Sequence, residues 1–297
     1  MPALWPVRNS RLREPRIFLP IFTGLLCLPL TFILYLSAAP HPSPVRSGKT
    51  AVSATDVNLL IDAEQALIRG CMRRHGFQYW PLPASQAYPA VRFPYVITSV
   101  SWARRHGFSG AFVPVASRDP NQRYYSQLTA TQQSAYSDAL VGSPGSPGVT
   151  TRLPTGGIDG HSADGCQATA DRQLYGNYAA WFKARFVALD LPGLWQGRVL
   201  GDPRYGSAVS MWSSCMRAKG YRYSSPAQAA SMASQQTRAA VTEAQCAGST
   251  GLTKVVDALD REYAARVSRE YRSSLEAEWR LERNALPRAR QVLRTQR

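Results

Sequence analysis

A stretch of nine residues occurs twice in this chain with little change. Residues 71–79 read CMRRHGFQY, and residues 215–223 read CMRAKGYRY. Apolar residues precede both copies at intervals of three or four, which predicts that each cysteine lies on the buried face of a helix. The basic residues suit the negative end of a helix, and the glycine can adopt the left-handed conformation that ends one. The repeat therefore predicts two equivalent helix ends, each followed by two aromatic residues.

A third version of the motif lacks the cysteine. Residues 102–108 read WARRHGF, with Trp102 in the place of the cysteine. A motif that is used three times is more typical of a repeated scaffold than of one catalytic centre. We therefore predict that residues 55–297 form a single helical domain made of two related halves, about 55–176 and 177–297.

An uncharged apolar segment, residues 17–39, determines where the domain would reside. It is long enough to cross ~30 Å of hydrocarbon as a helix. Four arginines precede it, and only two basic residues follow closely, so the positive-inside rule places residues 1–16 in the cytoplasm. We predict a single-pass anchor in the cell membrane with the bulk of the chain outside the cytoplasm. The alternative is a signal sequence that is cleaved to release a secreted protein.

Both alternatives export the remainder of the chain. Residues 40–54, which are rich in proline, serine and small residues, predict a flexible tether. The chain has 35 Lys+Arg and 19 Asp+Glu, a formal net charge of +16. Export argues against a nucleic-acid partner and makes anionic lipid or an acidic wall polymer the better match for this charge. A soluble arginine-rich surface without a polyanionic partner is the competing explanation.

Four cysteines lie beyond the apolar segment: Cys71, Cys166, Cys215 and Cys246. An even number of cysteines in an exported region predicts two disulfides, but counting leaves three pairings open. Each copy of the motif is followed by one further cysteine. If the halves are related, the pairs are therefore Cys71–Cys166 and Cys215–Cys246. Neither a C-x-x-C redox motif nor a finger-like zinc spacing is present in the sequence.

Helix signals dominate the domain, so we predict a mostly α fold. Thr55-Asp56 and Asp202-Pro203 are typical helix starts, and residues 129–142 read as a helix.

Two regions lack a helical pattern. Residues 109–128 look irregular, and residues 143–157 read as a flexible loop dense in glycine and proline. No stretch alternates convincingly as a strand.

The C-terminal region is the most regular. From about Val241 apolar residues step by three or four, while the opposite faces alternate arginine and glutamate. This pattern predicts one long C-terminal helix that Pro287 breaks or kinks, followed by a basic tail.

The two cysteine-containing copies of the motif resemble a stretch found in small secreted proteins and lipoproteins of high-GC Gram-positive bacteria. Residues 71–83 and 215–226 match its Cys-Met-Arg, its glycine and its trailing proline, but lack its Phe-Pro-Asp-Pro portion. The match covers less than a fifth of the chain. The resemblance implies an exported compartment and the same disulfide pairing, and it implies no activity.

The segment most like an active site is GGIDGHSADGC, residues 156–166. It gathers Asp159, His161 and Asp164, and these residue types can bind a metal ion or exchange protons. Their spacing matches no specific ligand motif, and a polar loop before a helix cap is the simpler interpretation. We therefore assign no catalytic, metal or cofactor residue.

The patterns together predict a membrane-anchored, non-catalytic binding or structural module of the cell envelope. The alternative is a hydrolase that acts on wall material through residues 156–166. The sequence does not indicate an oligomeric state.

Overall fold

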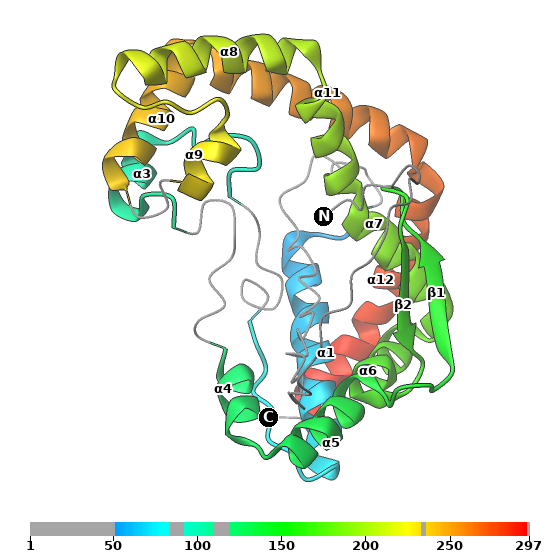
Figure 1. The fold of residues 1–297 in the computed structure, drawn as a ribbon. Helices are drawn as coiled ribbons and strands as arrows, with labels where there is room; N and C mark the ends of the chain where they lie inside the picture. Colours follow the sequence, from blue (N-terminus) through cyan, green and yellow to red (C-terminus); the bar gives the residue numbers. More distant parts are fainter. Residues whose placement is uncertain (1–50, 84–91, 110–118, 233–235, 296–297) are drawn as a thin grey trace, which may run out of the picture. The chain divides into compact units, whose positions relative to one another are not determined.

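The computed structural model describes residues 51–83, 92–109, 119–232 and 236–295. The predicted mostly α fold is confirmed for this part of the chain (Figure 1). Its helices are α1 (Ala54–Arg74), α3 (Val100–His106), α4 (Pro120–Gln127), α5 (Ala130–Val141), α6 (Gly165–Tyr175), α7 (Tyr178–Leu200), α8 (Pro203–Ala218), α9 (Pro226–Met232), α10 (Thr237–Ser249), α11 (Leu252–Glu270) and α12 (Arg272–Thr295). Its strands are β1 (Gly148–Arg152) and β2 (Ile158–Ser162).

The predicted membrane anchor lies outside the described residues, as do residues 1–16 and most of the tether. Among the residues that are described, no helix has both the length and the apolar character needed to span a bilayer. The anchor over residues 17–39 therefore stays a prediction.

The start of α1 shortens the predicted tether. Val52 is buried, and the Ser53 hydroxyl accepts a hydrogen bond from the backbone N–H of Asp56 at 3.1 Å. Ser53 is thus the N-cap of α1, which satisfies a backbone donor that the helix itself leaves free. The folded domain begins by residue 52, rather than at 55.

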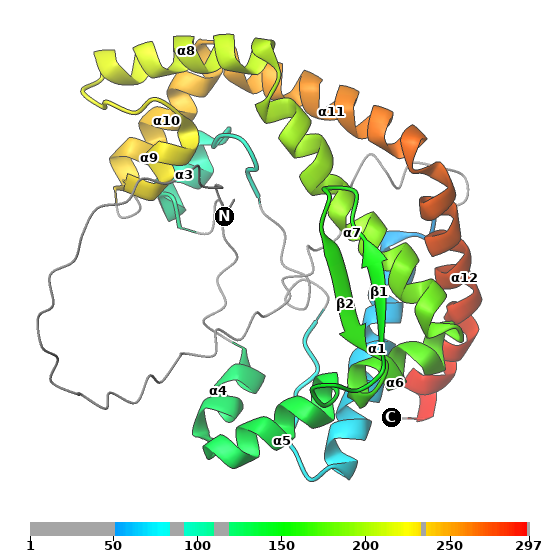
Figure 2. The ribbon, with the colours of Figure 1, turned by 45° about the vertical axis from the view of Figure 1, so that its right-hand side comes forward.

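Four helices from opposite ends of the domain pack together. α1 contacts α6 and α12, and α7 contacts the same two helices. Figures 1 and 2 both show α12 running beside α1. Their shared core includes Leu60 of α1, Leu174 of α6, Trp181 of α7 and Ala285 of α12. The last helix of the chain therefore covers the apolar face of the first.

A second core forms among α3, α8, α10 and the beginning of α11. It includes Trp212 and Met216 of α8, both fully buried, and the buried Trp102 of α3. α3 thus packs with elements of the predicted second half, while α12 packs with elements of the first. Helices of the two proposed halves therefore pack against one another across the boundary near residue 176. That the halves are related to each other stays a prediction.

The hairpin of β1 and β2 was not predicted. Residues 143–157 were expected to form a flexible loop, yet the strands pair antiparallel with Val149 opposite His161. A Cβ on Gly148 would lie 2.8 Å from the His161 carbonyl oxygen, so glycine permits this close approach of the strands. Each strand has a single apolar side chain, Val149 in β1 and Ile158 in β2, so the apolar alternation that identifies a strand is too weak to see.

α4 is also an addition to the expected fold, because residues 109–128 appeared irregular. The Asp119 carboxylate accepts a hydrogen bond from the N–H of Asn121 at 2.8 Å, and Pro120 takes the first helical position. This is the same Asp-Pro start signal that was recognised at residues 202–203.

The predicted single C-terminal helix is divided into α10, α11 and α12. Gly251, with φ of 82°, turns the chain between α10 and α11, and a second break at Tyr271 separates α11 from α12. Each of the three helices buries apolar residues at intervals of three or four. Because this spacing continues through both breaks, the sequence pattern does not show where one helix ends and the next begins.

Pro287 does not end the last helix, and the expected basic tail is helical as far as Thr295. A proline removes one helical hydrogen bond. Beyond it, Ala289, Val292 and Leu293 pack against the core of α1 and α6, and this packing holds the helix together.

Candidate functional site

Both cysteine-containing copies of the motif end a helix and cross-link it to another. Cys71 of α1 is bonded to Cys166 in the first turn of α6, with the Cα atoms 5.5 Å apart. Cys215 of α8 is bonded to Cys246 of α10, with the Cα atoms 5.7 Å apart. These are the pairs that the interpretation as two related halves predicts.

The residues after each cysteine form the same helix-ending hydrogen bonds. In the first copy the N–H of Phe77 donates to the Met72 carbonyl, and the N–H of Gly76 donates to the Arg73 carbonyl, both at 3.0 Å. This is a Schellman motif, which satisfies carbonyls that the helix leaves free. The second copy repeats both bonds, from Tyr221 to Met216 at 2.9 Å and from Gly220 to Arg217 at 3.0 Å.

Replacing either glycine of these helix ends by alanine is expected to destabilise the protein. Gly76 and Gly220 have φ of 81° and 88°, and a Cβ on either would meet no atom within 4 Å. The cost is therefore conformational, about 1–2 kcal/mol each, measured by thermal unfolding. Gly197 is the matched control, because it lies inside α7 with equally open space around it. Gly197→Ala is expected to stabilise by about 0.5–1 kcal/mol, and equal effects at the three sites would contradict the explanation.

The aromatic residues of the motif pack against the core. The Phe77 ring meets the Tyr136 ring edge-on, with centroids 5.4 Å apart, and the Tyr79 hydroxyl donates to Gln65 at 2.9 Å. Tyr221 and Tyr223 lie partly buried on the second core. These contacts account for the rings by packing.

The third copy of the motif replaces the disulfide by aromatic packing. Trp102 is buried, meets Phe93 edge-on at a centroid distance of 5.0 Å and stacks on His106 at 4.8 Å. Gly107, with φ of 59°, also ends its helix, α3, but with a different hydrogen bond, from its N–H to the Ala103 carbonyl at 2.8 Å.

The segment 156–166 is an ordered part of the fold. Asp159 and His161 lie on β2, and Asp164 is the N-cap residue of α6. The His161 imidazole lies against Phe182 and Phe186 of α7, with ring centroids 5.6 and 5.4 Å apart. Burial lowers the pKa of His161, and the negative charge of Asp159 opposes this shift. This ring packs as an aromatic side chain, so it gives the hydrolase alternative no positive support.

A cluster of charged residues among α1, α6, α7 and α12 was not predicted from the sequence. We call Glu64, Asp171, Arg185 and Glu278 the ionic cluster; Arg185 and Glu278 are buried, whereas Glu64 and Asp171 are partly exposed. Arg185 donates to Glu278 Oε1 at 3.2 Å, and both residues are buried. Burial and then the negative charge of Glu64 raise the pKa of Asp171, while Arg185 acts in the opposite direction. Glu278 belongs to the pattern of alternating arginine and glutamate that contributed to the prediction of a long C-terminal helix.

Removing the guanidinium of this cluster is expected to leave the buried Glu278 carboxylate without its ion pair to Arg185. Arg185→Met should lower the free energy of unfolding by about 3 kcal/mol, measured by urea denaturation. The double variant Arg185→Met with Glu278→Leu removes both charges and is expected to recover most of this loss. A double variant no more stable than the single one would show that the buried pair is not the source of the effect.

A second buried acid lies apart from this cluster. Glu243 of α10 is fully buried, and its Oε1 accepts a hydrogen bond from the N–H of Ile97 at 2.9 Å. Within the described part of the chain its Oε2 has no hydrogen-bond partner. Burial raises the pKa of Glu243 to about 8, against the smaller opposite effect of the Ile97 hydrogen bond. The carboxyl is therefore mostly protonated at neutral pH.

Burial removes more acids than bases from the protein surface. Of the charged residues described, those buried are four acids, Asp202, Glu243, Glu278 and Glu282, and one base, Arg185. The surface is therefore more positive than the charge count of the sequence indicates.

No protein-family model matches this chain, and no curated protein or solved structure is detectably similar to it. The resemblance to small secreted proteins and lipoproteins therefore stays a prediction.

Proposed function

We propose that this chain is a non-catalytic module of the cell envelope, held at the membrane by residues 17–39, that binds an anionic lipid surface or an acidic wall polymer. The unequal burial of acids and bases carries the proposal, because it leaves cations in excess on the outside of a cross-linked helical scaffold. Such a surface attracts polyanions over about a Debye length.

The three helix ends supply the cations best placed to be tested. We call Arg73, Arg74, Arg104, Arg105, Arg217 and Lys219 the helix-end cations; all six are exposed. As far as the chain is described, none of them forms an ion pair with a carboxylate. Their charges are therefore available to an external anion.

The end of the chain is a poorer choice for this test. Arg288 donates to the Leu174 carbonyl, and Arg290 pairs with Asp56 at 3.4 Å. Deleting residues 288–297 would also remove core residues of α12. Substituting exposed side chains can change polyanion binding without changing the fold. Deleting this segment would change both, so a loss of binding could not be assigned to the lost charges.

The test uses the full chain reconstituted in phosphatidylcholine nanodiscs. Binding is measured to polyphosphate, as a mimic of an acidic wall polymer, and to phosphatidylglycerol vesicles, with phosphatidylcholine vesicles as the blank. Changing the helix-end cations to glutamine is expected to weaken binding to one of the two anions about tenfold or more, since each cation at an anionic surface contributes about 1 kcal/mol. Added salt should weaken the binding of the unchanged protein.

The control changes cations that already have partners. Arg198, Arg204 and Arg266 pair with Glu270, Asp202 and Glu262, so their replacement by glutamine should affect binding less. Binding to neither anion, or unchanged binding by the sixfold variant, would overturn the proposal. Release of soluble fragments from wall material by the unchanged chain, lost in His161→Gln, would favour the hydrolase alternative instead.

A further inference from the structure

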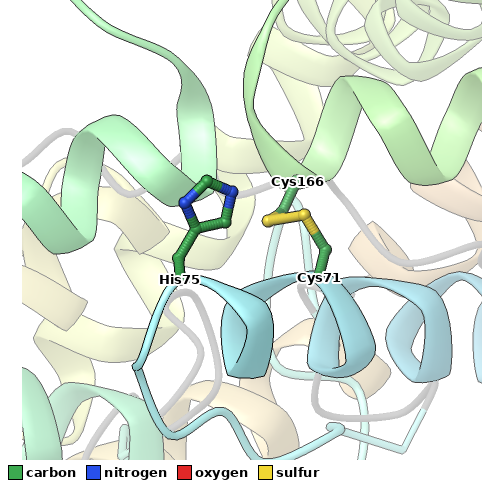
Figure 3. A group of neighbouring side chains, drawn as sticks. All are labelled: Cys71, His75 and Cys166. Carbon is green, nitrogen blue, oxygen red and sulfur yellow. A yellow bond between two sulfur atoms is a disulfide. The ribbon is translucent and has the colours of Figure 1, made fainter.

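A histidine stands beside the first disulfide and has no counterpart at the second. Figure 3 shows the His75 imidazole on the same side of α1 as Cys71, next to the sulfur atoms. The ligand atoms of Cys71, His75 and Cys166 all lie within 4.8 Å of one another. Cys71 and His75 are four residues apart on a helix, which places them on one face. Cys166 completes the group from the first turn of α6.

These three side chains are a ligand set for a soft divalent ion. Zinc binds cysteine thiolates and histidine nitrogen with tetrahedral geometry. The disulfide offers no thiolate, so the relevant species is the dithiol, the form in which the chain is synthesised. The positive end of α6 favours the thiolate of Cys166, which lies in its first turn.

The two cysteines of this group are buried, whereas the histidine is exposed to solvent. Cys166 is 0% exposed and Cys71 is 6% exposed, whereas His75 is exposed. An ion held here would have its two sulfur ligands in the core and its fourth position facing water. Three protein ligands and one open position are a familiar zinc arrangement.

The second copy of the motif provides an internal comparison. Lys219 occupies the position equivalent to His75, and an ammonium group is a donor without a lone pair for a metal. Its partner cysteine, Cys246, lies near the end of α10 rather than in a first turn. The second pair therefore offers two ligands where the first offers three.

We propose that the dithiol form of this chain binds one zinc ion through Cys71, His75 and Cys166. Two Zn–S bonds and one Zn–N bond form, two thiol protons pass to solvent, and no electron is transferred. Closing the disulfide afterwards requires zinc to leave and a disulfide-type oxidant to accept two electrons from the two sulfurs. The inference does not depend on the proposed polyanion binding.

Cobalt(II) is the probe for the binding test, because thiolate ligation and tetrahedral geometry give it a strong visible spectrum. The full chain in detergent is reduced with a phosphine and titrated with cobalt, which zinc then displaces. We expect one ion per chain. His75→Lys, which installs the residue of the second copy, should weaken binding about tenfold or more, since loss of even an outer-sphere partner costs 10- to 100-fold. The double variant Cys215→Ala, Cys246→Ala should retain the site.

Oxidation kinetics give a second measurement that does not depend on the cobalt spectrum. The reduced chain is oxidised with and without zinc, and the two disulfides are followed by alkylation and peptide mass. Zinc is expected to slow formation of Cys71–Cys166 much more than formation of Cys215–Cys246, and His75→Lys should remove the difference. Unchanged cobalt affinity in His75→Lys, or equal protection of both pairs by zinc, would overturn the proposal.

Discussion

Removing the Cys71–Cys166 disulfide is expected to lower the free energy of unfolding by about 5 kcal/mol, and removing Cys215–Cys246 by about 4 kcal/mol. The difference follows from the sequence separations, 95 residues for the first pair and 31 for the second. A cross-link restricts the unfolded chain more when it closes a longer loop, so its removal gains more unfolded-state entropy.

The comparison uses alanine at both positions of a pair, because a serine hydroxyl in place of the buried Cys166 sulfur would need a hydrogen-bond partner. Urea denaturation of the two double variants and of the unchanged protein gives the two losses. Under reducing conditions all three proteins should approach similar stability. A larger loss for Cys215–Cys246 would show that local packing, rather than loop length, sets the order.

Local signals explain what the sequence predicted well. Asp202-Pro203 begins α8, and Gly76 and Gly220 end helices, because each signal acts within a few residues of itself. The cysteine pairs follow from the repetition of the motif along the chain. Asp119-Pro120 carried the same start signal as Asp202-Pro203, so α4 could have been found by applying that rule again.

The features that were missed depend on contacts between distant residues. Glu278 is buried only because α12 returns to pack on α1, α6 and α7. Glu243 receives its hydrogen bond from Ile97, 146 residues earlier. His75 was interpreted only as a favourable residue at a helix end, since its distance to Cys166 depends on how α6 meets α1. Burial of a charge is a property of the assembled core, and the spacing of apolar residues does not report it.

Replacing Glu243 by glutamine is expected to stabilise the protein increasingly as pH rises. Between its ordinary pKa of 4.5 and the raised value of about 8, Glu243 keeps its proton in the folded state and loses it in the unfolded state. The folded state then binds more protons, so stability falls as pH rises through this window and levels off above it. At 1.36 kcal/mol per pKa unit the full effect is on the order of 5 kcal/mol.

Glutamine keeps the acceptor for the Ile97 N–H and has nearly the shape of the protonated acid. Urea denaturation between about pH 5 and pH 9 should therefore give nearly equal stabilities at the acidic end and a growing advantage for Glu243→Gln toward the basic end. Burial, and to a smaller extent the Glu243 charge, raises the pKa of Tyr205 above its ordinary value of 10.0, so Tyr205 keeps its proton over this pH range in both proteins. Glu276→Gln, at an exposed position of α12, is the matched control and should follow the unchanged protein at every pH. If the profiles of Glu243→Gln and the unchanged protein run parallel, then Glu243 is already ionised in the folded state, and its burial does not hold the proton.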